Sequence, residues 1–277
     1  MDRCIKYKKR HIFCCYLISA FVIMAAFLCG SVGKTVQAEE NSDFEETLYA
    51  RAAVLMDAES GRILYGKNEK EVMPMASTTK IMTCILALEN GNPDDLAKVS
   101  NYASKMPKVK LNVREGENYR LGDLLYSLML ESHNDSAVVI AEHISGSVEG
   151  FAELMNQKAR DIGCYNTYFI TPNGLDSAKG DKVHSTTAED LARIMSYCIT
   201  KSPRREEFLK ITQTTNYSFT NKSINENGDM VNGNRSFSCN NHNAFLSMME
   251  GALSGKTGFT GNAGAYEIIE PNFTYGI

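Results

Sequence analysis

The chain has 277 residues, of which 43% are hydrophobic and 22% are charged, the balance of a globular protein with a substantial buried core. Its net charge of −4 is unevenly distributed, because residues 1–38 carry six basic side chains and one acidic, and the remainder carries 23 basic and 32 acidic. A remainder with a net charge of −9 argues against nucleic-acid binding, which depends on Lys and Arg contacts with phosphate.

The N-terminus has the features of a secretory signal. Basic residues within the first ten positions precede an apolar run from Ile12 to about Gly30, and the small-residue pattern Val36-Gln37-Ala38 follows. An uncleaved anchor is the alternative to cleavage after Ala38, because the run approaches the length that spans a bilayer. In both cases we expect export, with membrane contact only through this segment. We predict a signal peptide, a polar linker and one domain, at residues 1–38, 39–49 and 50–277.

The cysteines do not form the pattern of a disulfide scaffold. Four of the eight lie within residues 1–38, and the other four show no CxxC spacing: Cys84, Cys164, Cys198 and Cys239. Cys84 and Cys198 lie in apolar helical patterns and are interpreted as small core residues. We predict no disulfide and no metal site, since the spacing of metal ligands is also absent from His143, His184 and His242.

A hairpin and a core helix are predicted after the linker. Residues 52–56 and 62–65 are strand candidates on either side of a turn at 57–61. Apolar residues then recur at the i, i+3, i+4, i+7 spacing of a buried helical face, at Ile81, Cys84, Ile85 and Leu88. Because Gly91-Asn92-Pro93 ends this pattern, Ser77 should lie at or near the start of the helix.

The middle of the chain is predicted to be mostly helical. Helical patterns cover residues 121–129, 137–144 and 151–162, with a polar break at Ser132 between the first two. Thr187, with Asp190 three residues later, forms a capping box for another helix that runs to about Ile199.

The last third of the chain is predicted to be rich in strands. The composition turns to Asn, Ser, Thr and Gly over residues 212–242, which indicates strands and loops, and residues 251–260 form a strand flanked by glycines. A hairpin, then many helices, then late strands indicate an α+β fold with helices packed on an antiparallel sheet. We expect the strands of this sheet to come from both ends of the chain.

Ser77 and Lys80 form a candidate nucleophile and base. A spacing of three residues puts both side chains on one face of a helix, so that the amine can take the hydroxyl proton as the serine attacks a carbonyl carbon. The lysine must be unprotonated for this role, and burial and a second cation such as Lys256 both favour that form. The pattern alone is weak evidence, because Ser31 and Lys34 match it inside the predicted signal.

Two further motifs, each in its expected setting, make the signal specific. Ser132-His133-Asn134 lies in the break between two helices, and Lys256-Thr257-Gly258 lies on the late strand. Together with Ser77 and Lys80 they are the motifs of penicillin-binding proteins and class A β-lactamases. The sequence of residues 76–83, 132–137 and 255–264 resembles that of the D-alanyl-D-alanine carboxypeptidase family of low-molecular-mass penicillin-binding proteins. Supporting matches lie at residues 57–61, 169–175 and 184–187.

This resemblance, which runs from about Ala50 to Gly264, implies a β-lactamase/transpeptidase-like fold with a helical subdomain and a serine carboxypeptidase activity. The implied partners are peptidoglycan stem peptides and β-lactam antibiotics, with no cofactor and no nucleic acid. The implied location is the cell wall or the outer face of the cytoplasmic membrane.

The resemblance also implies a role for each motif residue. Ser77 would attack the penultimate D-alanine carbonyl, Lys80 would act as general base, and Ser132 would relay a proton to the leaving amine. The remaining residues would bind substrate: Asn134 its amide, Lys256 and Thr257 its terminal carboxylate, and Gly258 would let it approach the strand. The backbone N–H groups of Ser77 and Phe259 would form the oxyanion hole.

Simpler interpretations exist for two residues of the second motif. His133 occupies the variable position, and we expect no catalytic role for it. Ser132 alone would also fit a helix cap.

The chain departs from the family pattern after Gly264. It ends 19 residues after Gly258, which leaves room for one strand, interrupted by Pro271. We therefore expect a domain whose C-terminal strands are missing, as in a truncated or frame-shifted product. Two alternative functions stay open: a non-catalytic binder of muropeptides or wall proteins, and a β-lactamase, although residues 166–190 present no convincing deacylating glutamate.

Overall fold

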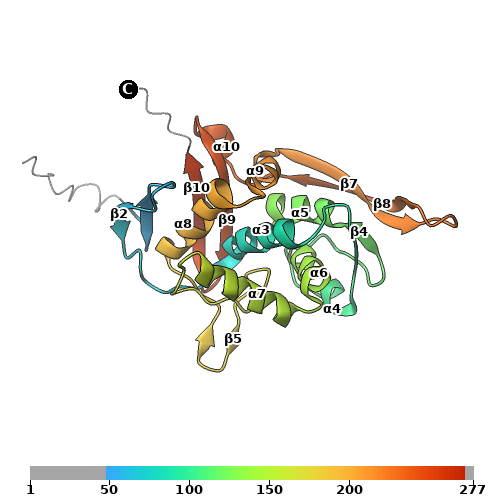
Figure 1. The fold of residues 1–277 in the computed structure, drawn as a ribbon, viewed down its shortest axis with the longest axis horizontal. Helices are drawn as coiled ribbons and strands as arrows, with labels where there is room; N and C mark the ends of the chain where they lie inside the picture. Colours follow the sequence, from blue (N-terminus) through green and yellow to red (C-terminus); the bar gives the residue numbers. More distant parts are fainter. Residues whose placement is uncertain (1–47, 272–277) are drawn as a thin grey trace, which may run out of the picture. The chain divides into compact units, whose positions relative to one another are not determined.

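Helix α3 (Lys80–Asn90) lies at the centre of the computed structural model, which describes residues 48–271 (Figure 1). Every side chain from Lys80 to Leu88 is buried, so this helix is covered on all sides, more completely than the predicted apolar face required. It ends at Gly91, as predicted. The predicted signal peptide and most of the linker lie outside the described residues.

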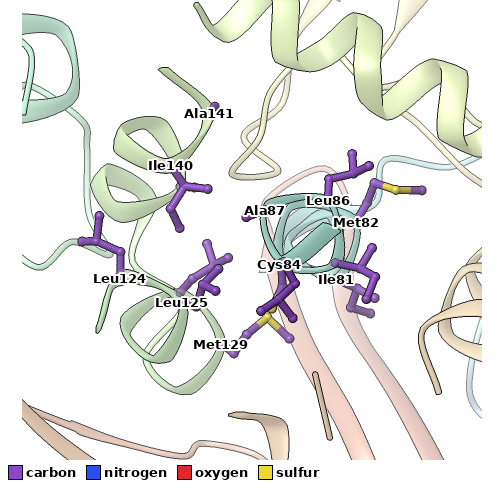
Figure 2. Packing of buried hydrophobic residues seen from close by; sticks show 14 of the residues in the cluster. Ile81, Met82, Cys84, Leu86, Ala87, Leu124, Leu125, Met129, Ile140 and Ala141 are labelled. Atoms are coloured by element: carbon purple, nitrogen blue, oxygen red, sulfur yellow. The ribbon is translucent and has the colours of Figure 1, made fainter. Parts of the chain in front are cut away.

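Several helices pack against α3. Among them are α5 (Leu121–Leu130), α6 (Asn134–Ser145) and α7 (Val148–Asp161). Figure 2 shows α5 presenting Leu125 and Met129, and α6 presenting Ile140, towards the α3 side chains. Fully burying an aliphatic side chain of this size contributes about 1.5–3 kcal/mol. These contacts therefore hold α3, and with it Lys80, in position.

The second helical group follows the predicted cap. The Thr187 hydroxyl accepts a hydrogen bond from Asp190 N–H at 3.1 Å and begins α8 (Ala188–Ser196), which continues as a π-helical turn, η2 (Tyr197–Lys201). The reciprocal half of a capping box is absent, because the Asp190 carboxylate accepts from Asn166 N–H and Thr167 instead. Helix α9 (Arg205–Gln213) was not predicted. The short helices are α4 (Asn101–Ser104) and α10 (Phe245–Met248).

The strands of the described residues form antiparallel sheets, which with the helices confirm the α+β class. One sheet has four strands in the order β3 (Leu96–Lys98), β4 (Asn118–Arg120), β7 (Asn216–Ile224) and β8 (Met230–Asn240). The others are hairpins: β1 (Ala53–Met56) with β2 (Ile63–Lys67), β5 (Ala178–Lys179) with β6 (Lys182–Val183), and β9 (Ala252–Thr260) with β10 (Gly264–Pro271).

One sheet built from both ends of the chain was expected, and the described residues differ from that. The β1–β2 and β9–β10 hairpins are separate two-stranded sheets, although α8 packs against both β1 and β10. The single C-terminal strand that was predicted is present as β10 and reaches Pro271. The described residues do not test the expectation that C-terminal strands are missing. Among residues 48–271 no helix is both long and apolar enough to cross a membrane.

Candidate active site

Ser77 lies in a tight turn that runs directly into α3. This turn, η1 (Ala76–Thr79), is a 3-10 helix, and its hydroxyl-bearing residue Thr79 donates to Ala76 O at 2.8 Å. Ala76 has a positive φ of 49°, a conformation that costs an L-residue energy and persists where its surroundings hold it. The half-buried Ser77 thus lies directly before α3, which the buried Lys80 begins, close to the predicted position.

Lys80 is fully buried and surrounded by acceptors. Its Nζ lies 2.8 Å from Ser77 Oγ, 3.0 Å from Asn134 Oδ1 and 2.5 Å from the carbonyl oxygen of Asn173. Burial, and secondarily the charge of Lys256, hold the pKa of Lys80 well below its ordinary value. In the neutral form two N–H bonds serve Asn134 and Asn173, which leaves the lone pair directed at the Ser77 hydroxyl. That arrangement suits a general base.

The Ser132-His133-Asn134 motif spans the break between α5 and α6, as predicted. Asn134 is the first residue of α6, and its side-chain oxygen accepts from Lys80 while its nitrogen donates to Lys108 O at 3.1 Å. Ser132 has a positive φ of 62°, and its buried hydroxyl has no hydrogen-bond partner within the described residues. An unpartnered hydroxyl at this place is available to a bound substrate.

A loop that sequence reasoning missed, residues 105–113, is held by the same motif. Asn134 N–H donates to Val109 O at 2.8 Å, and the Asp135 carboxylate accepts from the N–H groups of Leu111 at 2.9 Å and Val113 at 3.1 Å. These hydrogen bonds fix the loop to the start of α6, where Asn134 lies. Its only sequence signal was the acidic residue directly after Asn134.

Strand β9 supplies the third motif. Lys256 is buried, its Nζ donates to Thr257 O at 2.8 Å, and burial lowers its pKa to about 8. A Cβ added at Gly258 would lie 3.0 Å from Ser77 N, so the strand packs against the η1 turn at this residue. Close packing thus gives a reason for glycine besides the predicted approach of substrate. Thr257 is half-buried, and Phe259 is 72% exposed.

The loop at Asn173 is a second component that was missed as a part of the site. The carbonyl of Asn173 accepts from Lys80, and the Pro172 carbonyl accepts from Thr83 Oγ1 at 2.7 Å. Gly174 follows with φ 85°, and a Cβ there would lie 1.9 Å from Ala76 O. The match of residues 169–175 to the family sequence pointed to this loop. The sequence could not indicate its contact with Lys80, because a backbone carbonyl makes that contact and every residue has one.

The remaining titratable groups near the motifs have structural partners. His133 Nδ1 lies 2.8 Å from Ser127 Oγ, and burial lowers the pKa of His133. His242 and His143 contact the surface carboxylates of Glu131 and Asp95. The one glutamate between residues 166 and 190 is Glu189, and its carboxylate pairs with Arg193 at 2.6 Å. This carboxylate is therefore bound to a structural partner and does not match the deacylating glutamate of a β-lactamase.

The structure thus joins Ser77, Lys80 and Asn134 by direct hydrogen bonds and places Gly258 against the Ser77 backbone. Lys256 acts on Lys80 through its charge. Substrate contacts of Ser132, Thr257 and Phe259 stay predictions.

Comparison with known proteins gives one family. The chain matches the model of the D-alanyl-D-alanine carboxypeptidase peptidases over residues 35–269. The D-alanyl-D-alanine carboxypeptidase DacF of Bacillus subtilis is 34% identical over 220 residues, which cover 77% of this chain and 52% of that protein.

Two solved structures show the same fold. A D-alanyl-D-alanine carboxypeptidase from Mycobacterium tuberculosis superposes with a TM-score of 0.69 at 26% identity, covering 81% of this chain and 78% of that one. A penicillin-binding protein from Listeria monocytogenes, solved in an ampicillin-bound form, gives 0.63 at 26% identity, covering 81% and 86%. The chain spans about half the length of the curated relatives it matches. With a family match over most of its length and the motifs assembled in one place, the chain belongs to the D-alanyl-D-alanine carboxypeptidase family of peptidases.

Proposed function

We propose that the protein is a serine D-alanyl-D-alanine carboxypeptidase that removes the terminal D-alanine from peptidoglycan stem peptides, and that β-lactams acylate the same serine. The observation that carries this proposal is the position of Lys80 Nζ, 2.8 Å from Ser77 Oγ and buried so that the pKa of the amine falls well below its ordinary value. A neutral amine at hydrogen-bond distance makes the hydroxyl a nucleophile.

The reaction follows from the residues around that pair. Ser77 Oγ bonds to the penultimate D-alanine carbonyl carbon while its proton passes to Lys80. The negative charge that develops on the carbonyl oxygen is met by the N–H groups of Ser77 and Phe259, each worth about 3 kcal/mol in the transition state. Ser132 then relays the proton from Lys80 to the D-alanine amine as the C–N bond breaks, which leaves Lys80 neutral again, and water hydrolyses the resulting ester.

Strand β9 supports the binding of an extended peptide. Among the strands of the described residues β9 is hydrogen-bonded to β10 alone, so its other edge has no strand partner, which suits a peptide that adds as a strand. The buried cation of Lys256 next to Thr257 suits the terminal carboxylate. Asn134 contributes to the opposite wall and would exchange its contact with the 105–113 loop for one with the substrate amide.

The place of action is part of the proposal. The basic and apolar pattern of residues 1–38 supports export, with the domain acting outside the cytoplasm, where stem peptides occur. Cleavage after Ala38 or retention as an anchor is decided by N-terminal sequencing of the exported protein.

The test compares the wild type with Ser77→Ala, and with Ser218→Ala on the exposed part of β7 as a matched control. The wild type and Ser218→Ala should release D-alanine from a pentapeptide and carry one labelled penicillin at Ser77, and Ser77→Ala should do neither. A folded wild type that acquires no label and releases no D-alanine would contradict the proposal and favour a non-catalytic binder. Fast turnover of penicillin in place of a persistent acyl-enzyme would instead identify a β-lactamase.

A further inference from the structure

His184 is a buried side chain between two parts of the active site, and it takes no direct part in the proposed reaction. It is 1% exposed and lies between the nucleophile turn η1 and the loop of residues 170–174. The Phe169 ring packs edge-on against the imidazole, with ring centroids 6.0 Å apart. A polar ring buried this completely must satisfy both nitrogens, and it does.

The partners of the ring determine where its proton lies. Nδ1 is 2.9 Å from the backbone N–H of Ile170, which can only donate, so Nδ1 is the acceptor. The neutral imidazole therefore carries its proton on Nε2, which lies 2.9 Å from Thr79 Oγ1. Burial lowers the pKa of His184 to about 4, so the ring stays neutral at neutral pH.

This tautomer directs a chain of hydrogen bonds towards Ser77. Nε2–H donates to Thr79 Oγ1, and the Thr79 hydroxyl donates its own proton to Ala76 O at 2.8 Å. The Ala76 carbonyl belongs to the same planar peptide unit as the Ser77 N–H, and the two point in opposite directions. Fixing the carbonyl therefore fixes the direction of an N–H group that the proposed mechanism uses in the oxyanion hole.

The other side of the ring holds the partner of the base. Ile170 and the residues after it lead to Asn173, whose carbonyl accepts from Lys80 at 2.5 Å. Gly174 then packs against Ala76 O, so the loop and the turn meet at the carbonyl that Thr79 also holds. One imidazole thus connects the segment that bears the nucleophile with the segment that orients the base.

We propose that His184 is a positioning residue for this reaction: through Thr79 and the Ala76 carbonyl it aims the Ser77 N–H at the developing oxyanion, and through Ile170 it seats the Asn173 carbonyl on Lys80. The inference rests on the proposed function. It predicts an effect on the transition state rather than on ligand binding, because an oxyanion forms only during reaction.

Acylation by labelled penicillin separates the two effects. His184→Phe keeps a ring beside Phe169 and removes both hydrogen bonds, and Thr79→Val removes the hydroxyl of the relay. Each should lower the limiting acylation rate constant about tenfold, less than the 10²–10³-fold loss of a whole oxyanion donor, with the apparent dissociation constant within about twofold. The double variant should be no slower than the slower single variant, since both interrupt one chain.

Conservative and distant variants serve as controls. His184→Gln places an amide nitrogen near the Nε2 position and should recover most of the rate, whereas His143→Phe, a substitution at the surface contact with Asp95, should leave it unchanged. Thermal unfolding of each variant identifies any that do not fold, and Thr79→Val keeps the test available if His184→Phe is among them.

A second readout does not require activity. In the unreacted wild type, NMR should show His184 protonated on Nε2, and the Ser77 amide proton should shift in both His184→Phe and Thr79→Val. If the wild type is acylated, and His184→Phe and Thr79→Val react as fast as the wild type, the role of His184 is overturned and the proposed function stays intact. An unlabelled wild type would contradict the proposed function, and an unmoved Ser77 amide would then overturn the relay separately.

Discussion

The Lys80 amine is buried away from water, and three hydrogen-bond partners in the protein replace its hydration. The benefit is chemical, since the same burial that makes the charged form unfavourable produces the neutral base. Such a group is retained for reactivity at the expense of stability, because an apolar side chain of similar length would fill the space without a buried amine. The residue is therefore a point where stability and activity oppose each other.

Replacement of Lys80 by methionine should separate its effect on stability from its effect on activity. We expect Lys80→Met to abolish acylation and to raise the free energy of unfolding at pH 7 by about 1 kcal/mol, because the fold no longer holds a buried amine in its uncharged form. The oxygens of Asn134 and Asn173, which lose the N–H groups of Lys80, offset part of this gain. Denaturant unfolding measures the second effect. Lys210→Met, on the exposed face of α9, is the control and should change neither. A destabilised Lys80→Met would contradict this account of the residue.

The pKa of Lys80 also predicts a dependence of stability on pH. Its folded-state pKa lies below that of the unfolded chain, so between these two values the unfolded state binds more protons. The free energy of unfolding should therefore rise with pH from the lowered pKa up to about 10.5. Lys80→Met should lose this contribution and keep that of Lys256, whose pKa is about 8. Unfolding curves at pH 7 and pH 9 measure the difference, and equal pH slopes for both proteins would count against it.

At the scale of elements, one carboxylate, that of Asp135, holds the 105–113 loop at Leu111 and Val113. Asp135→Ala should leave the N–H groups of Leu111 and Val113 without partners, at about 1–3 kcal/mol for each buried donor. Hydrogen exchange at these two amides should accelerate, and acylation should slow because Asn134 loses the carbonyls that hold it. Asp135→Asn keeps one acceptor oxygen and should protect one of the two amides. Unchanged exchange in Asp135→Ala would show that the loop is held by other contacts.

The helices were predictable from the sequence, and the way segments meet was not. The predicted helix at residues 121–129 falls inside α5, and the one at 151–162 overlaps α7 and passes its end by one residue, because their apolar residues must face α3. Helix α9 was missed because only Phe208, Ile211 and Thr212 of its residues are buried. The pairing of β3–β4 with β7–β8 joins segments far apart along the chain, and no local pattern specifies it.

The same division applies to the site. Ser77, Lys80 and Asn134 carry their chemistry in side chains at motif spacing, and the structure brings them together. Asn173 contributes a carbonyl, which every residue has, and His184 acts through a threonine 105 positions away. Sequence spacing could locate the reacting groups and could not locate the groups that aim them.

At the scale of the whole molecule, the described cysteines report on cooperative unfolding. The thiols of Cys84, Cys164, Cys198 and Cys239 are all free and buried, and burial raises the pKa of each. A thiol without solvent access and with little thiolate reacts slowly.

We expect these four thiols to stay unmodified by a thiol reagent in the native protein and to react together above the denaturant midpoint. Peptide-level mass spectrometry assigns modification to each position, and the protein in 6 M guanidinium is the fully reactive control. Modification of one of the four under native conditions would reveal local opening around that residue.

The hydrogen bonds of the site join residues that are increasingly distant along the chain. Lys80 meets Ser77 across three positions, Asn134 across 54 and Asn173 across 93, and Thr79 meets His184 across 105. Contacts of such high sequence separation form late, because the loops between them must close first. A nascent or partly collapsed chain would thus contain Ser77 and Lys80 without the long-range contacts that make them reactive. Covalent labelling by penicillin during refolding would accordingly time the last steps of assembly, trailing the appearance of helical signal.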